Sequence, residues 1–248
     1  MFERVKIKQI NDHIWLMNDH DEATGYIVLG TKKALIIDTM NGYENVKKIA
    51  ESITKLPIMV VNTHGHPDHI YGNIYFEEAY LHPRDMKLAQ LFYDNPEFQK
   101  EAKKCGLKPA AFKPILGGEK IDLGGIELEV YEIPGHTPGG ICLLDRADRI
   151  LFSGDSINKH TWMQSEDNLP MTEFLKSLER LQSIRSAYDF ILTGHSSELE
   201  DGSNYEALKK AVKEVCEGKN EHDVPYKWFG GICKAHPYSK EPRLIVYK

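Results

Sequence analysis

The sequence lacks the features that mark exported and membrane-embedded chains. It has four cysteines in 248 residues, widely spaced and without a Cys-x-x-Cys pair. Such spacing predicts no disulfide framework and is typical of reduced thiols in the cytoplasm. The first residues contain no apolar core like that of a signal peptide, and no apolar run approaches the roughly 18 residues of a membrane span. We therefore expect a cytoplasmic protein with no membrane partner.

Clustered positive charge is also missing. The 31 Lys and Arg residues are outnumbered by 37 Asp and Glu, so the net charge is −6. A nucleic-acid-binding surface needs gathered basic side chains to neutralise phosphates, so we expect no nucleic-acid partner. Hydrophobic residues make up 41% and charged residues 27%, which is ordinary for a globular protein. Without repeats or low-complexity stretches, the sequence predicts a single domain over residues 1–248.

What the sequence does contain is a dense group of metal-ligand residues. The string His64-Gly65-His66-Pro67-Asp68-His69 carries four imidazole or carboxylate side chains. It follows the apolar run 58–62, which predicts a buried strand, so the string begins on the loop after a strand. His64 and His66 are two residues apart, and an extended backbone sends both rings to one side. Imidazole and carboxylate together suit Zn²⁺, with Fe or Mn as alternatives.

Three more apolar strands each deliver one ligand-type residue at their ends. His136 lies in the turn Pro134–Gly140, after an alternating strand over residues 126–133. Asp155 ends the run 150–156, and His195 follows the strand that starts at Phe190. Alone, each has an ordinary interpretation as a turn residue or a helix cap. Together with the first string they favour a metal site.

These four motifs, THGHPDH, PGHTPGG, FSGDS and LTGH, occur in this order along the chain. With them the chain resembles the metallo-β-lactamase-fold hydrolase superfamily. The resemblance implies two metal ions: one held by His64, His66 and His136, the other by Asp68, His69 and His195, with Asp155 bridging both. Pro67 stands where the family usually has a small residue, often Ala. Proline has no ligand role, so the implied site does not depend on that position.

The resemblance also implies the chemistry. Two Zn²⁺ ions lower the pKa of bound water to about 7, so hydroxide is available at neutral pH. A metal-bridging hydroxide is then expected to cleave a small ester, thioester, lactone or amide, as in the glyoxalase-II-like and lactonase-like members. Asp68 is the expected catalytic residue, orienting the nucleophile and carrying a proton to the leaving atom. The chain is thus predicted to be a dinuclear zinc hydrolase.

Other readings of the same ligands stay open. One is a mononuclear iron oxidoreductase resembling the superfamily's sulfur dioxygenases, and another is a phosphodiesterase of a small substrate. A binding protein without turnover is disfavoured because the ligand set is complete. Flavin-linked di-iron reductases, which have Glu in place of His66, and true β-lactamases, which have Cys in place of Asp155, are also disfavoured. The expected partner is a small-molecule substrate, and the oligomeric state is open, a homodimer included.

The implied fold is α+β: a four-layer αβ/βα sandwich of two mixed β-sheets flanked by helices, with the metals at one edge between the sheets. The pattern of apolar residues agrees with it. Antiparallel strands are expected over residues 7–17 and 26–38, and a final strand over 244–247. Amphipathic helices are expected over residues 43–54, 172–183 and 205–216.

Specificity is expected in the segments around the metal edge. Residues 86–114 form a candidate helical lid insert, broken near Asn95–Pro96. The polar segment 18–22 and the segment 157–164 are each either part of the pocket or a surface loop or subunit contact. The aromatic segment 226–231 either walls the pocket or covers an edge. Which of their residues bind substrate is not predicted.

Overall fold

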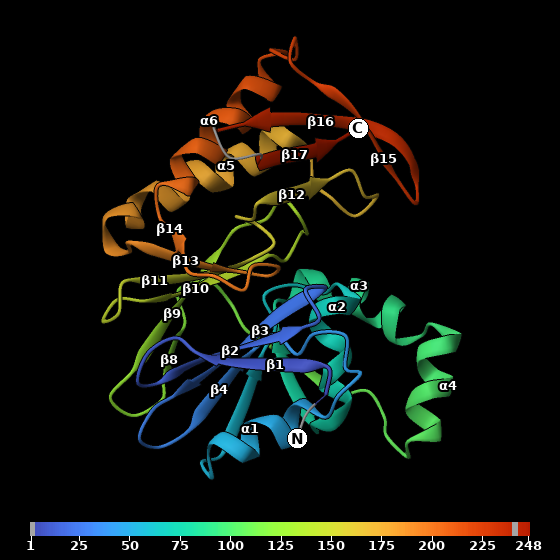
Figure 1. Ribbon diagram of the computed structural model, residues 1–248, viewed down its shortest axis with the longest axis vertical. Coiled ribbons are helices and arrows are strands. Elements are labelled where there is room, and N and C mark those ends of the chain that lie inside the picture. Colours follow the sequence, from blue (N-terminus) through green and yellow to red (C-terminus); the bar gives the residue numbers. More distant parts are fainter. Residues whose placement is uncertain (1–2, 240–242) are drawn as a thin grey trace.

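The computed structural model describes residues 3–239 and 243–248, and two β-sheets packed face to face form its centre. Helices cover the outer side of each sheet (Figure 1). The α+β four-layer sandwich predicted from the sequence is therefore confirmed. No helix in the two described ranges is both long enough and apolar enough to cross a bilayer.

The first sheet contains seven strands in chain order. The pairs from β1 to β4 are antiparallel, and the pairs from β4 to β7 are parallel. Its strands are β1 (Val5–Gln9), β2 (Ile14–Asp19), β3 (Ala23–Leu29), β4 (Ala34–Ile37), β5 (Ile58–Val61), β6 (Glu78–Leu81) and β7 (Ala111–Pro114). Parallel neighbours need crossover connections, and these are α1 (Val46–Ile53), α2 (Pro67–Ile70) with the 3₁₀ turn η1 (Tyr71–Tyr75), and α3 (Pro83–Tyr93) with α4 (Pro96–Lys104).

The second sheet has six strands in the order β14-β13-β11-β10-β9-β8. Its strands are β8 (Lys120–Asp122), β9 (Glu127–Glu132), β10 (Ile141–Asp145), β11 (Ile150–Gly154), β13 (Phe190–Thr193) and β14 (Glu200–Asp201). Strands β11 and β13 are parallel, and α5 (Met171–Leu181) with the 3₁₀ turn η2 (Gln182–Ala187) lies in the connection between them. Helix α6 (Asn204–Cys216) follows β14. Both sheets thus direct parallel strand ends toward one edge.

The alternation of side chains along the strands builds the layers. In β3, Tyr26 and Val28 join the core between the sheets, whereas Ile27 faces the opposite side and packs with α1. The predicted amphipathic helices bury the expected faces: α1 buries Val46, Ile49 and Ala50, and α5 buries Phe174, Leu178 and Leu181. The four layers follow from these two periodicities, two residues for strands and 3.6 for helices.

A third, smaller sheet was not predicted from the sequence. It has the order β12-β17-β16-β15, with β12 (His160–Met163), β15 (Val224–Trp228), β16 (Gly231–Tyr238) and β17 (Arg243–Tyr247). The predicted final strand is confirmed as β17. Strand β12 lies in the segment 157–164 and pairs in parallel with β17, far along the chain. The sheet packs on α5 and α6, where Tyr238 and Ile245 join their apolar cluster.

The candidate lid insert, residues 86–114, consists mainly of two helices and a strand. Its helices end at Tyr93 and Lys104, and its last residues form β7, which extends the edge of the first sheet. Pro96 is the first residue of α4, as the predicted break requires. Helix α4 lies at the outer edge of the molecule (Figure 1). Movement of this segment as a lid stays a prediction.

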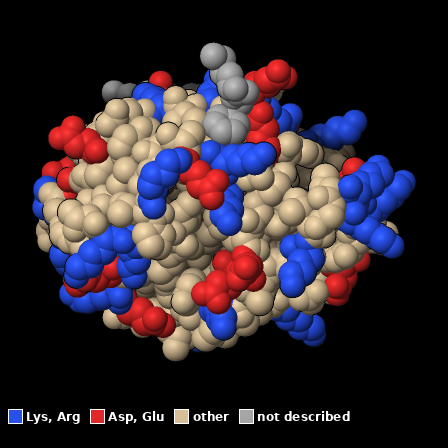
Figure 2. Space-filling view, turned by 90° about the horizontal axis from the view of Figure 1, so that it is seen from below, with Lys and Arg blue, Asp and Glu red and all other residues tan. Residues whose placement is uncertain are grey.

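The charged side chains on one face of the molecule are mixed. In Figure 2, Lys and Arg are scattered among Asp and Glu on a largely uncharged background. A small group of Lys and Arg lies at the right edge of this view, and elsewhere the two signs of charge are interspersed. The absence of a nucleic-acid partner stays a prediction.

Candidate metal centre

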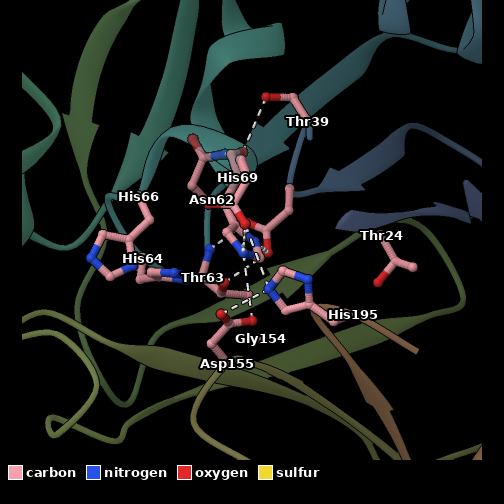
Figure 3. A network of polar contacts seen from close by, with 12 residues as sticks. Thr24, Thr39, Asn62, Thr63, His64, His66, His69, Gly154, Asp155 and His195 are labelled. Carbon is pink, nitrogen blue, oxygen red and sulfur yellow. Dashed lines mark hydrogen bonds and ion pairs between the residues drawn. The ribbon is translucent and has the colours of Figure 1, made fainter. Parts of the chain in front are cut away.

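The seven predicted ligands lie together at one edge between the two main sheets, and Figure 3 shows His64, His66, His69, Asp155 and His195 among them. Each comes from a chain segment that follows a strand: the loop and helix α2 after β5 carry His64, His66, Asp68 and His69, and the loops after β9, β11 and β13 carry His136, Asp155 and His195. Strand ends of both sheets therefore supply the site, as the sequence predicts.

The ligands form two groups. The ring nitrogens of His64, His66 and His136 lie within 4.8 Å of one another, and Nδ1 of His66 is 3.0 Å from Nε2 of His136. Asp68, His69 and His195 form the second group, also within 4.8 Å. In it, Oδ2 of Asp68 is 3.5 Å from Nε2 of both histidines. These are the two sets that the resemblance implies.

Asp155 lies between the two groups. Its Oδ2 is 3.0 Å from Nε2 of His195 and 3.6 Å from Nε2 of His136. Its Oδ1 is 3.5 Å from Nε2 of His69. A carboxylate in contact with histidines of both sets is positioned to bridge two ions.

The local backbone explains how adjacent residues reach different groups. His66 is extended, with φ −77° and ψ 152°, and Pro67 is the first residue of the short helix α2. Proline suits that position because its φ is preset and its missing N–H is not needed there. The change from strand-like to helical backbone turns Asp68 and His69 away from His66. Glycine at 194 is also required, because a Cβ there would overlap the Asp155 carboxylate.

The outer nitrogen of each histidine faces an acceptor, which fixes its tautomer. Nδ1 of His136 donates to the carbonyl oxygen of Trp162 (2.7 Å), and Nδ1 of His195 donates to that of Glu22 (2.8 Å). A carbonyl can only accept, so both Nδ1 atoms carry hydrogen and both Nε2 atoms keep a lone pair. That lone pair is what a metal ion needs.

Carboxylates hold two more histidines in the same way. Nε2 of His66 donates to Oδ2 of Asp167 (2.6 Å), which leaves Nδ1 free on the inner side. Nδ1 of His69 donates to Oδ2 of Asp38 (2.9 Å), which leaves Nε2 free. Carboxylate partners of this kind orient the ring and raise its basicity toward a metal.

Asp38 also reaches His64 through Thr63. Its Oδ1 accepts the Thr63 backbone N–H (2.7 Å), and its Oδ2 accepts the Thr63 hydroxyl (2.7 Å). Having given away its one proton, that hydroxyl accepts from Nδ1 of His64 (3.0 Å). Asp38 is buried and has φ 60°, a backbone conformation that few side chains tolerate.

The residues present fit metal ions. Nε2 of His64 and Nε2 of His69 are buried, yet neither has a hydrogen-bond partner in the described part of the chain. A buried polar atom without a partner is costly. Here the unpartnered atoms are inward lone pairs beside carboxylates, and an imidazole and carboxylate set suits Zn²⁺, Fe or Mn.

The charges of the two groups differ. Burial and neighbouring imidazoles lower the pKa of His136 to about 4 and that of His64 well below its usual value. Burial also lowers the pKa of His69, but the nearby carboxylates, Asp68 first, outweigh it and raise that pKa well above its usual value. Burial raises the pKa of Asp155, but His195 and His69 hold it well below normal. The carboxylate-rich group therefore favours positive charge, which a bound cation supplies.

Comparison with known proteins decides the family. The model of the Metallo-beta-lactamase superfamily matches residues 20–215. The chain belongs to this superfamily. The match covers all seven ligand positions and ends before the C-terminal hairpin formed by β15 and β16.

Relatives and solved structures of the superfamily agree with this assignment. The chain is 28% identical over 202 residues to acyl-coenzyme A thioesterase MBLAC2 of Gallus gallus, covering 71% of this chain and 73% of that protein. It is 31% identical over 133 residues to hydroxyacylglutathione hydrolase GloC of Haemophilus influenzae, covering 50% and 61%. The metallo-β-lactamase family protein TTHA1429 of Thermus thermophilus has a TM-score of 0.65 at 18% identity, covering 87% and 85%, which shows the shared fold.

Three carboxylates near the metal centre were not predicted from the sequence: Asp38, Asp85 and Asp167. Asp85 is fully buried and accepts from Gly65 N (3.0 Å), Thr137 Oγ1 (2.6 Å) and Gly139 N (2.5 Å). Burial raises its pKa against these bonds. Asp85 thereby fastens the loop after β5 to the loop after β9. Asp38 could have been found, because it ends an apolar strand as Asp155 does, but Asp85 and Asp167 carry no such signal.

A cavity of about 680 Å³ opens from the metal centre. Metal-ligand residues form its floor, namely His66, Asp68, His136 and Asp155, and aromatic residues form much of its wall, namely Phe92, Trp162, Tyr226, Trp228 and Phe229. Of the interpretations left open for segments 157–164 and 226–231, the structure favours the wall of the pocket, because residues of both line this cavity. A second cavity of about 490 Å³ lies beside His195 and includes Asp21 and Glu22 of the predicted segment 18–22.

Proposed function

We propose that the protein is a dinuclear zinc hydrolase that cleaves a thioester. The observation that carries the proposal is the pair of ligand groups, each with lone pairs aimed inward and joined through Asp155. The names of two relatives support the choice of bond, because one is an acyl-coenzyme A thioesterase and the other acts on hydroxyacylglutathione. Both coenzyme A and glutathione carry acyl groups on a thiol. The four free cysteines support a reducing compartment such as the cytoplasm.

The proposed ligands divide as the geometry groups them. His64, His66 and His136 would hold one ion, and Asp68, His69 and His195 the other, with Asp155 between them. Bound divalent ions supply two things to such a reaction: a lowered pKa of water, to about 7, and polarisation of a carbonyl oxygen.

Asp68 differs from Asp155 in a way that suits proton transfer. Its side chain is 29% exposed and lines the large cavity, whereas that of Asp155 is 5% exposed. A carboxylate that reaches the cavity can accept the proton of the attacking water and pass it to the departing sulfur. The C–S bond breaks, the new C–O bond gives the carboxylic acid product, and the sulfur leaves as a thiol.

The other protein groups orient this arrangement. Asp38, Asp167 and the carbonyl oxygens of Trp162 and Glu22 hold the histidine rings by their outer nitrogens. Preset ring orientations reduce the reorganisation that binding and reaction would otherwise require.

The test combines metal analysis with a substrate panel. The purified chain is assayed for zinc, iron and manganese, and for hydrolysis of thioesters, oxygen esters, lactones, β-lactams and phosphodiesters. We expect two zinc ions per chain and the highest kcat/KM on thioesters. One iron per chain with oxygen uptake would instead establish the dioxygenase alternative, and preferred turnover of a phosphodiester would refute the thioester assignment.

A further inference from the structure

The cavity above the metal centre has a wall that lies outside the part of the chain matched by the family model. Strands β15 and β16 pair antiparallel from Val224 with Ala235 to Trp228 with Gly231, and their turn is Phe229–Gly230. Trp228 and Phe229 at this turn line the cavity. The hairpin therefore supplies a feature of this chain beyond residues 20–215.

The hairpin exposes Phe229 at its tip, whereas Trp228 beside it is half-buried. The Phe229 side chain is fully exposed, at 100%. Its ring centroid lies 4.6 Å from that of Trp228. A Cβ on Gly230 would overlap the Trp228 indole, so glycine at this position lets the indole lie across the turn. An exposed aromatic side chain beside a half-buried one, next to a cavity, is typical of a binding site for an apolar group.

The charged side chains that line the cavity are mostly carboxylates. Among the residues that line it, Lys227 is the one Lys or Arg. Glu166 pairs with Lys248, and Asp167 is engaged by His66. Coenzyme A carries several negative charges, which a lining with the carboxylates Asp68, Asp155, Glu166 and Asp167 does not attract. The cavity therefore suits the acyl part of a thioester better than its carrier.

Trp162 lines both cavities of the site. Beyond it, the second cavity has a polar lining that includes Asn158, Lys159 and His160, next to His195. A thioester whose carbonyl lies at the ligands can thus direct its acyl group into the aromatic cavity, whereas the second cavity, with Asp21 and Glu22, offers charged and polar groups instead. At about 680 Å³ the aromatic cavity is within the usual range for drug-sized ligands, so it accommodates much more than an acetyl group.

We propose that the hairpin tip, Trp228 and Phe229, together with Phe92 and Trp162, binds the apolar acyl group of the substrate and selects thioesters with large acyl groups. This inference rests on the proposed thioesterase function. It assigns substrate selection to a C-terminal element rather than to the metal loops.

The test is Phe229→Ala, compared on acetyl, hexanoyl, octanoyl and phenylacetyl thioesters of N-acetylcysteamine. Because all four substrates have the same leaving group, differences in kcat/KM between them report the acyl group alone. We expect kcat/KM for octanoyl to fall about tenfold, mainly through KM, as for loss of about 1.4 kcal/mol of apolar contact. Acetyl turnover should stay unchanged. Ile232→Ala is the matched control, because Ile232 is 78% exposed on the same hairpin but does not line this cavity.

An equal change on acetyl and octanoyl thioesters, or no change on either, would overturn the inference while leaving thioester hydrolysis intact. A second measurement does not depend on turnover. S-octyl-N-acetylcysteamine, a thioether that cannot be hydrolysed, is titrated while tryptophan fluorescence is recorded, since Trp162 and Trp228 both line the cavity. Binding to the wild-type chain that weakens about tenfold in Phe229→Ala supports the inference. No binding to the wild-type chain overturns it, whether or not the protein proves to be a thioesterase.

Discussion

Replacing Asp38 by asparagine tests how much the orientation of the histidine rings contributes to metal affinity, without removing a proposed ligand. Asp38 is not one of the proposed ligands, yet it contacts the outer nitrogen of His69 and, through Thr63, that of His64. Asparagine is nearly the same size and tolerates the φ of 60° found here better than most residues do. The substitution therefore keeps the backbone and changes one acceptor atom into a donor.

The structure gives the size of the effect. The asparagine oxygen can still accept the Thr63 N–H, but its NH₂ group then faces the Thr63 hydroxyl and Nδ1 of His69. The hydroxyl can rotate and accept, whereas Nδ1–H of His69 loses its acceptor. A hydrogen bond to a charged group contributes about 1.5–3 kcal/mol, which corresponds to roughly a tenfold to hundredfold loss of metal affinity. We expect that loss in the group that contains His69.

The assay is a zinc titration of Asp38→Asn against a chromophoric chelator, with zinc per chain measured at each step. The wild-type chain should show two binding steps, and one of them should weaken by the stated factor. Asp19→Asn is the control, because Asp19 is equally buried but pairs with Arg4 and Asn41 rather than with a histidine. Unchanged zinc affinity in Asp38→Asn would refute the reasoning, and so would an equal loss in the control variant.

Three further outcomes follow from the site and the surface. Asp68→Asn should lower kcat by about a hundredfold or more at full zinc content, and full activity at full zinc content would remove the proton role. Gly194→Ala should displace the Asp155 carboxylate and lower zinc content and Tm, as seen by metal analysis and thermal unfolding; unchanged values would contradict the close packing. The hydrogen bond and charge of Arg146 lower the pKa of Glu129 to about 2 from its ordinary 4.5, so Glu129 adds stability above pH 4.5 that is lost as the pH falls toward 2. Because this pair lies at the surface, the free energy of unfolding of Glu129→Gln, measured in urea at about pH 7, should be lower than that of the wild type by about 1 kcal/mol or less. The difference should disappear in acid, and a difference that grows in acid would contradict the prediction.

The ligands could be predicted from the sequence because their signal is local. His64, His66, Asp68 and His69 stand within six positions, and His136, Asp155 and His195 each follow a recognisable apolar strand. The carboxyl ends of neighbouring strands meet at one edge, so the fold brings such residues together. The apolar periodicity of α1, α5 and α6 is also a local signal, and it predicts the helix faces that pack to form the layers.

What the sequence could not provide depends on contacts between distant segments. Asp85 lies on α3 and reaches the loops after β5 and β9 only in the folded chain. Strand β12 is four residues long and has no alternating apolar pattern; it becomes a strand because β17 pairs with it. In the sequence, the aromatic tip at Trp228 and Phe229 is only a loop with unusually many aromatic residues. Its place beside the cavity is given by the folded structure alone.

The pairing of β12 with β17 connects a strand far along the chain to the candidate metal centre. Trp162 of β12 contributes its carbonyl oxygen to His136 and its indole to both cavities, and it pairs with Val246. A change in β17 is therefore expected to affect both the orientation of the His136 ring and the wall of the cavities. The third sheet therefore cannot be exchanged as a separate module, because the strand that β17 pairs with also supplies the carbonyl oxygen that orients His136.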